Sequence, residues 1–223
     1  MTFGGFDPAA VALLDRLPDM TADEYADHKA MLTAGVTKPG AGLIADLADL
    51  LDADLTVAPR SSVSPLHRDL RFAPEGAARY KDHLLLTTWE GRDKRVSPMF
   101  WIRVDAHRVG FASGIGFTPE VRERWRKRVA GEPGATVANE LAALIATRGA
   151  EVAGDRIKRV PAPFDADHPR ADLLLHTGFQ VRFAEPLPAS IDRPEFVAWC
   201  AERLAALLPV HHWLLANLTD RTD

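Results

Sequence analysis

The sequence predicts an α+β fold: a single domain over residues 1–223 in which helices pack around an antiparallel sheet. Three observations support this. Apolar residues recur at helical spacing near both ends of the chain, short apolar runs bounded by turn residues occupy residues 84–114, and no change in composition marks a linker. Of the 223 residues, 47% are hydrophobic and 26% are charged, which is ordinary for a folded protein and excludes disorder as the main state.

The first quarter of the sequence is predicted to be helical. Asp7 before a proline is typical of a helix start, because the carboxylate caps free N–H groups and proline needs no acceptor; this predicts a helix over 8–17. Thr21 followed three residues later by Glu24 forms a capping-box pattern and predicts a second helix. Leucines at helical spacing predict a third over 39–51.

The middle of the sequence changes to the period of strands. Three apolar runs, residues 84–89, 100–104 and 109–114, are separated by short polar connections, so they predict an antiparallel meander. Alternation along the second run places Ile102 on one face and Arg103 on the other. The remaining chain is predicted to form helices over 119–129 and 135–147, a strand over 157–160, a short helix that contains 173–175, a strand over 178–183, and helices beginning at Pro194 and Pro209.

Charge is distributed unevenly along the chain. The net charge is −4, but residues 1–59 carry 3 Lys/Arg against 10 Asp/Glu, residues 60–108 carry 10 against 6, and residues 109–223 carry 14 against 15. The overall balance argues against a general nucleic-acid-binding protein, because such domains carry a basic excess that neutralises phosphates. The basic middle segment indicates either an anion-binding surface or a sheet that forms ion pairs with acidic helices.

Within this basic segment the most polar stretch is 64–72, continued by 78–83. In an extended backbone, His67, Asp69 and Arg71 would point to one side. A histidine with an aspartate can serve as a base and its orienting group, so His67 and Asp69 are the catalytic candidates. The same two residues are also compatible with a satisfied pair at the surface.

The cations of this stretch suggest a site for a small anion. Arg68, Arg71 and Lys81 are suited to a carboxylate or a phosphate, the arginines through their bidentate geometry and the lysine as a point charge. Tyr80 would add a hydroxyl donor. Arg103 would join these residues if its strand lies beside this loop.

Several short patterns in a fixed order resemble one family. They are Phe3–Phe6, His67–Phe72 followed by Tyr80–Lys81, and Ile157–Pro161 followed by Asp167–Pro169. Over about residues 3–218 the sequence is similar to the bacterial and fungal conserved-hypothetical group called domain of unknown function 2461. The sequence departs from the family pattern around Gly76–Arg79 and Asp19–Tyr25. The resemblance implies a one-domain protein with no assigned activity.

The resemblance also adds Lys158, Arg159 and His168 as ligand-binding candidates, because they lie in the second polar stretch shared with the family. We therefore expect a protein that binds a small anionic ligand and acts on it if His67 is a base. The alternative is a non-catalytic interaction or dimerisation module, in which the basic stretch meets an acidic partner or the acidic helices of a second copy.

Other classes of protein receive no support from the sequence. It has neither a His-Glu-x-x-His pattern nor paired cysteines, so we expect no metal, and Gly114–Gly116 lacks the third glycine of a dinucleotide fingerprint, so we expect no cofactor. The single Cys200 follows the apolar stripe of a helix, typical of a buried thiol. The N-terminal residues do not resemble a signal peptide, and no apolar run reaches about 20 residues. A cytoplasmic protein without membrane association is expected.

Overall fold

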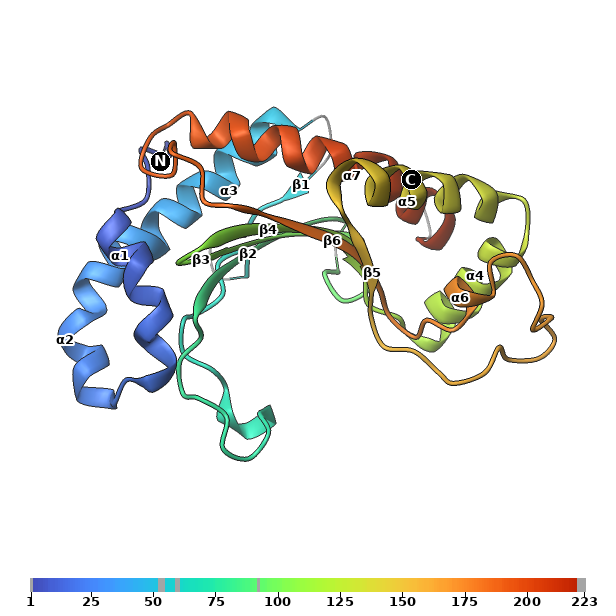
Figure 1. Cartoon of the computed structure of the whole chain (residues 1–223), viewed down its shortest axis with the longest axis horizontal. Coiled ribbons are helices and arrows are strands. Elements are labelled where there is room, and N and C mark those ends of the chain that lie inside the picture. Colours follow the sequence, from blue (N-terminus) through green and yellow to red (C-terminus); the bar gives the residue numbers. More distant parts are fainter. Residues whose placement is uncertain (1, 52–54, 59–60, 92, 220–223) are drawn as a thin grey trace. The chain divides into compact units, whose positions relative to one another are not determined.

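A computed structural model describes residues 2–51, 55–58, 61–91 and 93–219 (Figure 1). It confirms the α+β class: helices accompany a six-stranded antiparallel sheet with strand order β1-β2-β3-β4-β6-β5. The strands are β1 (Leu55–Thr56), β2 (His83–Glu90), β3 (Met99–Asp105), β4 (Arg108–Ile115), β5 (Glu151–Ala153) and β6 (Phe179–Pro186). The predicted meander corresponds to β2, β3 and β4, which are neighbours in the sheet.

The helices are α1 (Pro8–Leu13), α2 (Ala22–Leu32), α3 (Lys38–Leu50), α4 (Pro119–Ala130), α5 (Pro133–Arg148), α6 (Ala171–Leu174) and α7 (Phe196–Leu218). Three of the helices, α1, α2 and α4, begin at the side-chain caps that the sequence predicts. Asp7 accepts a hydrogen bond from the N–H of Ala9 at 2.9 Å, and Thr21 and Glu24 form the predicted capping box. Gly149 ends α5 in the left-handed conformation (φ 60°) that glycine adopts without strain.

The chain divides into two compact units. Unit 1 contains the residues up to Thr88, together with Trp101–Phe111 and Ala184–Arg203. Unit 2 contains Trp89–Phe100, Ala112–Phe183 and the residues from Leu204 onward. That these units form a single domain stays a prediction. Within the described residues, no helix combines the length and the apolar character needed to cross a membrane.

The Phe-Gly-Gly-Phe pattern near the N-terminus belongs to the core of unit 1. Phe3 and Phe6 meet edge to face at a centroid distance of 5.1 Å, and both contact the ring of Phe196. Between them, Gly5 has a φ of +118°, and a Cβ at this position would lie 2.1 Å from the carbonyl oxygen of Asp192. Glycine is therefore required here both by its backbone conformation and by the close approach of a second segment.

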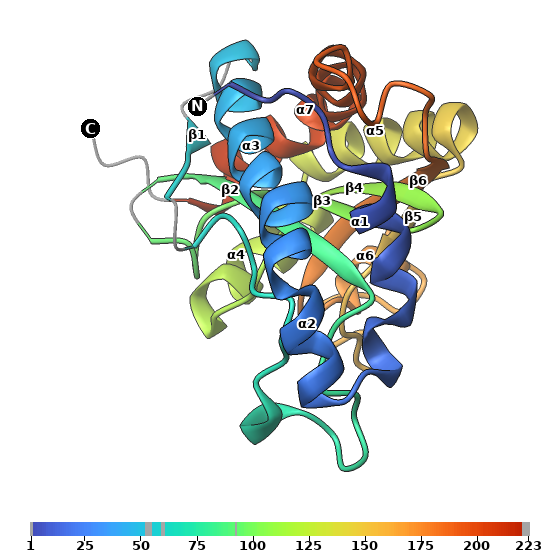
Figure 2. The ribbon, with the colours of Figure 1, turned by 90° about the vertical axis from the view of Figure 1, so that its left-hand side faces the viewer.

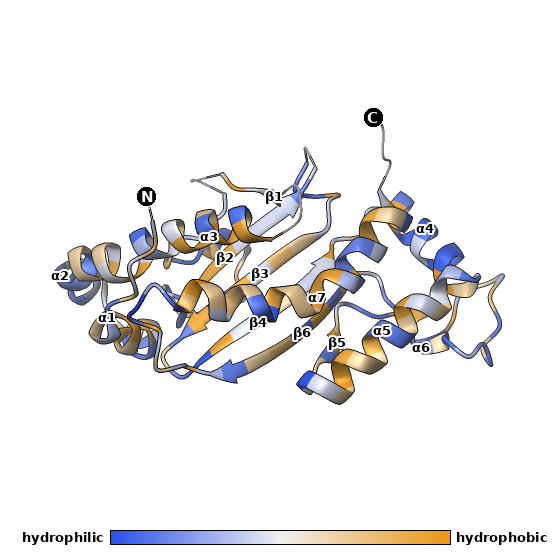
Figure 3. Ribbon diagram, turned by 90° about the horizontal axis from the view of Figure 1, so that it is seen from above, coloured by the Kyte–Doolittle hydropathy of each residue, from blue (hydrophilic) through white to orange (hydrophobic). Residues whose placement is uncertain are grey.

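The sheet in unit 1 has the alternation predicted for β3. Ile102 and Val104 are fully buried, whereas Arg103 lies on the opposite, exposed side. Figure 3 shows apolar residues concentrated along β2 and β3. The alternation therefore leaves one face of β3 available for polar side chains, and the candidate site uses it.

In unit 2 the core is built around one tryptophan. Trp125 of α4 is completely buried, and its ring lies 4.6 Å from Phe179 of β6 and 5.7 Å from Trp213 of α7, measured between centroids. Its indole N–H donates to the carbonyl of Leu173 at 2.8 Å. Trp125 thus connects two helices and a strand within this unit.

The predicted strand over 157–160 is wrong. This segment has an irregular backbone, and the strand on this side of the sheet is instead β5, whose residue Val152 pairs with Val181. Arg156 makes an isolated bridge to His176, and Pro161 follows shortly after. Among the described residues no strand lies beside 158–160, so this segment has no ladder to join.

Two separate helices from Pro194 and Pro209 are also not found. A single 23-residue helix, α7, runs from Phe196 to Leu218 with Pro209 inside it. Leu207 and Val210 on either side of the proline are fully buried. Proline removes one hydrogen bond of the helix, and burial of the apolar stripe on both sides offsets that loss.

A buried histidine in unit 2 links α7 to the sheet. His211 is completely buried, its ring stacks on Phe100 at 4.0 Å, and its Nδ1 lies 3.1 Å from Oγ of Ser113. Its Nε2 is 3.6 Å from Oε1 of Glu90, too far for a normal hydrogen bond. Burial lowers the pKa of His211 even though Glu90 opposes this, so the ring is neutral in the folded protein at pH 7.

This histidine predicts a loss of stability in mild acid. The pKa of His211 is lower in the folded chain than the unfolded value of about 6.5, so only the unfolded state takes up the proton as the pH falls below that value. The free energy of unfolding is expected to fall from pH 7 to pH 5, above the range in which most carboxylates titrate. Burial lowers the pKa of His83 and His176 in the same direction.

Urea unfolding at pH 7 and pH 5 measures this effect, with His211→Gln as the variant and His212→Gln, an exposed neighbour, as its control. The difference in stability between the two pH values should shrink in His211→Gln and be unchanged in His212→Gln. An equal pH dependence in all three proteins would contradict the assignment.

Candidate functional site

The polar stretch identified in the sequence forms a two-stranded ribbon, which we call the basic ribbon and define as residues 65–82. His67 and Tyr80 face each other in an antiparallel bridge, flanked by a backbone hydrogen bond from Arg68 to Arg79 and one from Lys81 to Leu66, both 2.8 Å long. Figure 2 shows the ribbon continuing from β2 to the short 3-10 turn at its far end. The ribbon belongs entirely to unit 1.

Tyr80 fixes the ribbon to α2. It is 6% exposed, and its ring stacks almost parallel on Tyr25 at a centroid distance of 4.0 Å and an angle of 10°. Burial raises the pKa of Tyr25, with a smaller contribution from Tyr80. The ring of Tyr80 is therefore an anchor of the ribbon, and the ligand-binding role of its hydroxyl stays a prediction.

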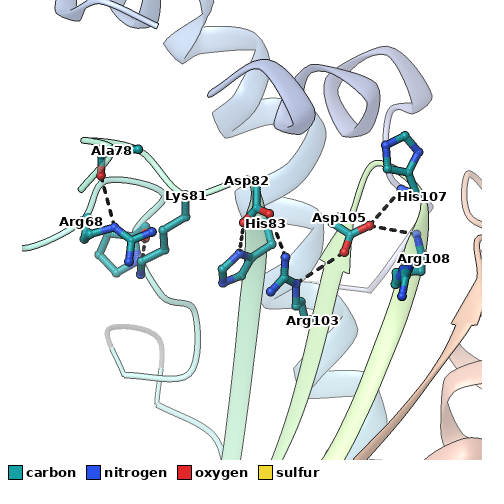
Figure 4. A network of polar contacts seen from close by, with 10 residues as sticks. Arg68, Ala78, Lys81, Asp82, His83, Arg103, Asp105, His107 and Arg108 are labelled. Carbon is teal, nitrogen blue, oxygen red and sulfur yellow. Dashed lines mark hydrogen bonds and ion pairs between the residues drawn. The ribbon is translucent and has the colours of Figure 1, made fainter. Parts of the chain in front are cut away.

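Two of the predicted cations come together on the ribbon. Nε of Arg68 donates to the carbonyl of Ala78 at 3.2 Å, and Nζ of Lys81 donates to the carbonyl of Pro65 at 2.9 Å (Figure 4). Burial, together with the charge of Arg68, lowers the pKa of Lys81. Among the described residues, neither side chain has a carboxylate within ion-pair distance. The ribbon therefore holds two neighbouring positive charges on backbone oxygens alone.

The predicted acid/base pair is arranged differently from the expectation. Asp69 begins the 3-10 turn Leu70–Phe72 and accepts two hydrogen bonds from the Arg71 guanidinium, at 2.9 and 2.7 Å. These bonds lower the pKa of Asp69. His67 is exposed, and the described contacts include no hydrogen bond between it and Asp69. The turn breaks the alternation on which the pairing of these residues was predicted.

A different aspartate and histidine meet at the base of the ribbon. Oδ1 of Asp82 lies 2.5 Å from Nδ1 of His83, and Oδ2 accepts a hydrogen bond from Nη2 of Arg103 at 2.9 Å. Arg103 also lies 3.4 Å from Asp105 through its Nε. Figure 4 shows that these side chains gather where β2 begins and β3 ends. Arg103 thus joins the region as predicted, but as the ion-pair partner of two carboxylates.

Asp82 and His83 lie within the polar stretch 78–83, but the sequence pattern alone does not predict them as site residues. Their direct adjacency at the start of a strand was the available signal, and it is a weak one. The decisive contact comes from Arg103, which is 21 residues away in the sequence and reaches Asp82 only because β2 and β3 are neighbours.

The three candidates taken from the second polar stretch lie in unit 2. His168 has both ring nitrogens engaged: Nε2 lies 3.2 Å from the carbonyl of Ala130, and Nδ1 accepts from the N–H of Arg170 at 3.0 Å. The guanidinium of Arg170 donates to the last carbonyls of α4, so this motif caps a helix. Lys158 and Arg159 are exposed on the irregular segment.

In the described part of the chain, no cluster of three or more His, Cys, Asp or Glu side chains is arranged to hold a metal ion. Cys200 is buried, and burial raises the pKa of its thiol well above the usual value. It is thus protonated at pH 7 and behaves as part of the apolar core.

The fold and the site define an α+β protein with an antiparallel sheet and a cationic ribbon beside an Asp–His–Arg cluster. A family model described as conserved hypothetical protein (DUF2461) matches residues 23–213. The chain therefore belongs to this family, as the resemblance predicted. The match begins after the Phe-Gly-Gly-Phe pattern. A comparison with curated proteins finds no match.

Proposed function

We propose that the protein binds a small molecule carrying a phosphate or carboxylate group, and that Arg68 and Lys81 are its principal ligand-binding residues. The observation that carries the proposal is that these two cations lie side by side on the ribbon (Figure 4), where the charge of Arg68 lowers the pKa of Lys81, and that neither has a carboxylate partner among the described residues. An anion between them would relieve their mutual repulsion. It would also complete the hydrogen-bonding capacity that backbone carbonyls satisfy only in part.

The other cations are less suited to this role. Arg71 is paired with Asp69, and Arg103 is neutralised by Asp82 and Asp105. A ligand would compete with those carboxylates for the same guanidinium groups. The backbone contacts of Arg68 and Lys81 instead hold their side chains in place before a ligand arrives, which reduces the entropy lost on binding.

Inorganic phosphate and succinate are the probes that test this function. Each ligand is expected to stabilise the wild-type chain in thermal unfolding, by about 2.7 kcal/mol at a concentration one hundred times its dissociation constant. The double variant Arg68→Gln/Lys81→Gln should lose this stabilisation. Arg95→Gln is the control, because it also removes an exposed cation. Arg95 pairs with Asp93 in unit 2, whereas the basic ribbon belongs to unit 1.

The proposal fails if neither anion stabilises the wild type, or if the double variant responds as the wild type does. In that case the non-catalytic interaction or dimerisation module is the better hypothesis, and sedimentation over a range of concentrations would test it. From the sequence alone we also propose a cytoplasmic location. Nucleic acid is disfavoured as the ligand because the net charge of the chain is −4.

A further inference from the structure

We propose that His83 is the proton acceptor of the anion site and that Asp82 is its positioning residue. The inference rests on the proposed function and names its chemistry: the substrate is a small anion with an O–H group, or one that holds a water molecule, beside its phosphate or carboxylate. In the step, the proton moves from that oxygen to Nε2 of His83, and the oxygen keeps the electron pair. The imidazolium then returns the proton to the product or to solvent.

The ring of His83 is held in one tautomer by Asp82. Burial alone would raise the pKa of Asp82, but the hydrogen bond from His83 and the charge of Arg103 outweigh this effect and lower the pKa overall. The carboxyl group is therefore ionised at pH 7. An ionised carboxylate can only accept hydrogen bonds, so Nδ1 of His83 must carry the hydrogen that faces it. In a neutral imidazole this leaves Nε2 with its lone pair available as a base.

The ring of His83 is uncharged at pH 7. Three charged groups act on His83: Asp82 raises its pKa, whereas Arg103 and Lys81 lower it. Burial is the largest influence, and the pKa is lowered overall. The ring is thus neutral at pH 7 and can accept a proton. When it does, Asp82 lies beside the new positive charge and stabilises it.

His83 lies close to the cations of the basic ribbon. His83, the first residue of β2, follows Lys81 by two residues, and the charge of Lys81 acts on its ring. The charge of Arg68 in turn lowers the pKa of Lys81. Figure 4 shows Arg68, Lys81, His83 and Arg103 in this order from left to right, at the end of the sheet where β2 begins. The described residues provide no hydrogen-bond partner for Nε2 of His83, in contrast to His168, whose ring nitrogens are both engaged.

The experiment follows the histidine rings of the full chain by long-range nitrogen–proton NMR, with His83→Gln to assign the signals. Wild-type His83 is expected as the tautomer with hydrogen on Nδ1. Saturating inorganic phosphate should raise its pKa by about one unit, because a dianion would lie near the ring. In Asp82→Asn the amide can donate to Nδ1, and the population with hydrogen on Nε2 should increase.

A second variant avoids dependence on the stability of Asp82→Asn. Arg103→Gln removes a cation but keeps the Asp82–His83 hydrogen bond, so the tautomer should be retained while the pKa of His83 rises. Arg95→Gln should behave as the wild type. Diethyl pyrocarbonate, which modifies unprotonated imidazole nitrogens, should react with His83, and phosphate should slow this reaction.

The outcomes separate the two proposals. If phosphate neither stabilises the chain nor shifts any signal, the proposed anion site fails. If phosphate stabilises the chain through Arg68 and Lys81 while His83 carries its hydrogen on Nε2, the role of His83 is overturned and the binding function stands. Phosphate binding with no change in the pKa of His83 also overturns the inference.

Discussion

Trp125→Ala is expected to lower the free energy of unfolding by about 3–5 kcal/mol, as is typical when a large aromatic side chain is removed from a core. The ring of Trp125 is fully buried against Phe179 and Trp213, and its N–H is bonded to the carbonyl of Leu173. Truncation would leave a cavity in unit 2 and an unpaired carbonyl oxygen. Urea unfolding followed by circular dichroism measures the loss.

Trp125→Phe provides the control for this prediction. It retains an aromatic ring but cannot donate to Leu173, so it should cost less than the alanine variant, about 1–3 kcal/mol for the unsatisfied carbonyl. If both variants were destabilised by less than about 1 kcal/mol, the central role of Trp125 in unit 2 would be refuted.

Arg203→Met is expected to lower the free energy of unfolding by about 2 kcal/mol, between the values typical of an exposed and of a buried ion pair. Arg203 is 13% exposed, bonds Glu185 at 3.0 Å and lies over the ring of Trp199 at 4.0 Å from its centroid. Methionine preserves much of the contact with the ring. The carboxylate of Glu185, which is 27% exposed, would lose its ion pair with Arg203.

The double variant Arg203→Met/Glu185→Met tests this explanation. It removes both charges of the Arg203–Glu185 pair, so it should recover most of the stability lost in the single variant. Glu202, which also pairs with Arg203, is 64% exposed, and losing that contact should cost little. The exposed pair Arg95 and Asp93 is the control: Arg95→Met should change stability by less than about 1 kcal/mol. A double variant no more stable than Arg203→Met would show that the effect comes from packing and not from charge.

The parts of the fold set by neighbouring residues were predictable from the sequence. The caps at Asp7 and Thr21 and the turn at Gly149 each depend on contacts within a few residues, and all three are present. The predictions of a strand over 157–160 and of a helix beginning at Pro209 were wrong because contacts between residues far apart in the sequence decide these elements. Partner strands and burial in the tertiary structure decide these elements, and a local pattern does not record them.

The candidate site shows the same division. The basic stretch identified from segment charges contains Arg68 and Lys81, which the ribbon brings together. The roles of individual residues depended on geometry that alternation alone misjudged. A 3-10 turn directs Asp69 to Arg71, and the neighbouring strand brings Arg103 to Asp82. Local composition thus located the region, whereas the pairing of strands determines its chemistry.

The shortest strands of the sheet are at its two edges. β1 has two residues and β5 has three, whereas each of the four inner strands has at least seven. A peptide or a second copy adding a strand at either edge would find only a few free backbone groups. Recognition of any protein partner should therefore depend on side chains, and fibril-like association through sheet edges is disfavoured.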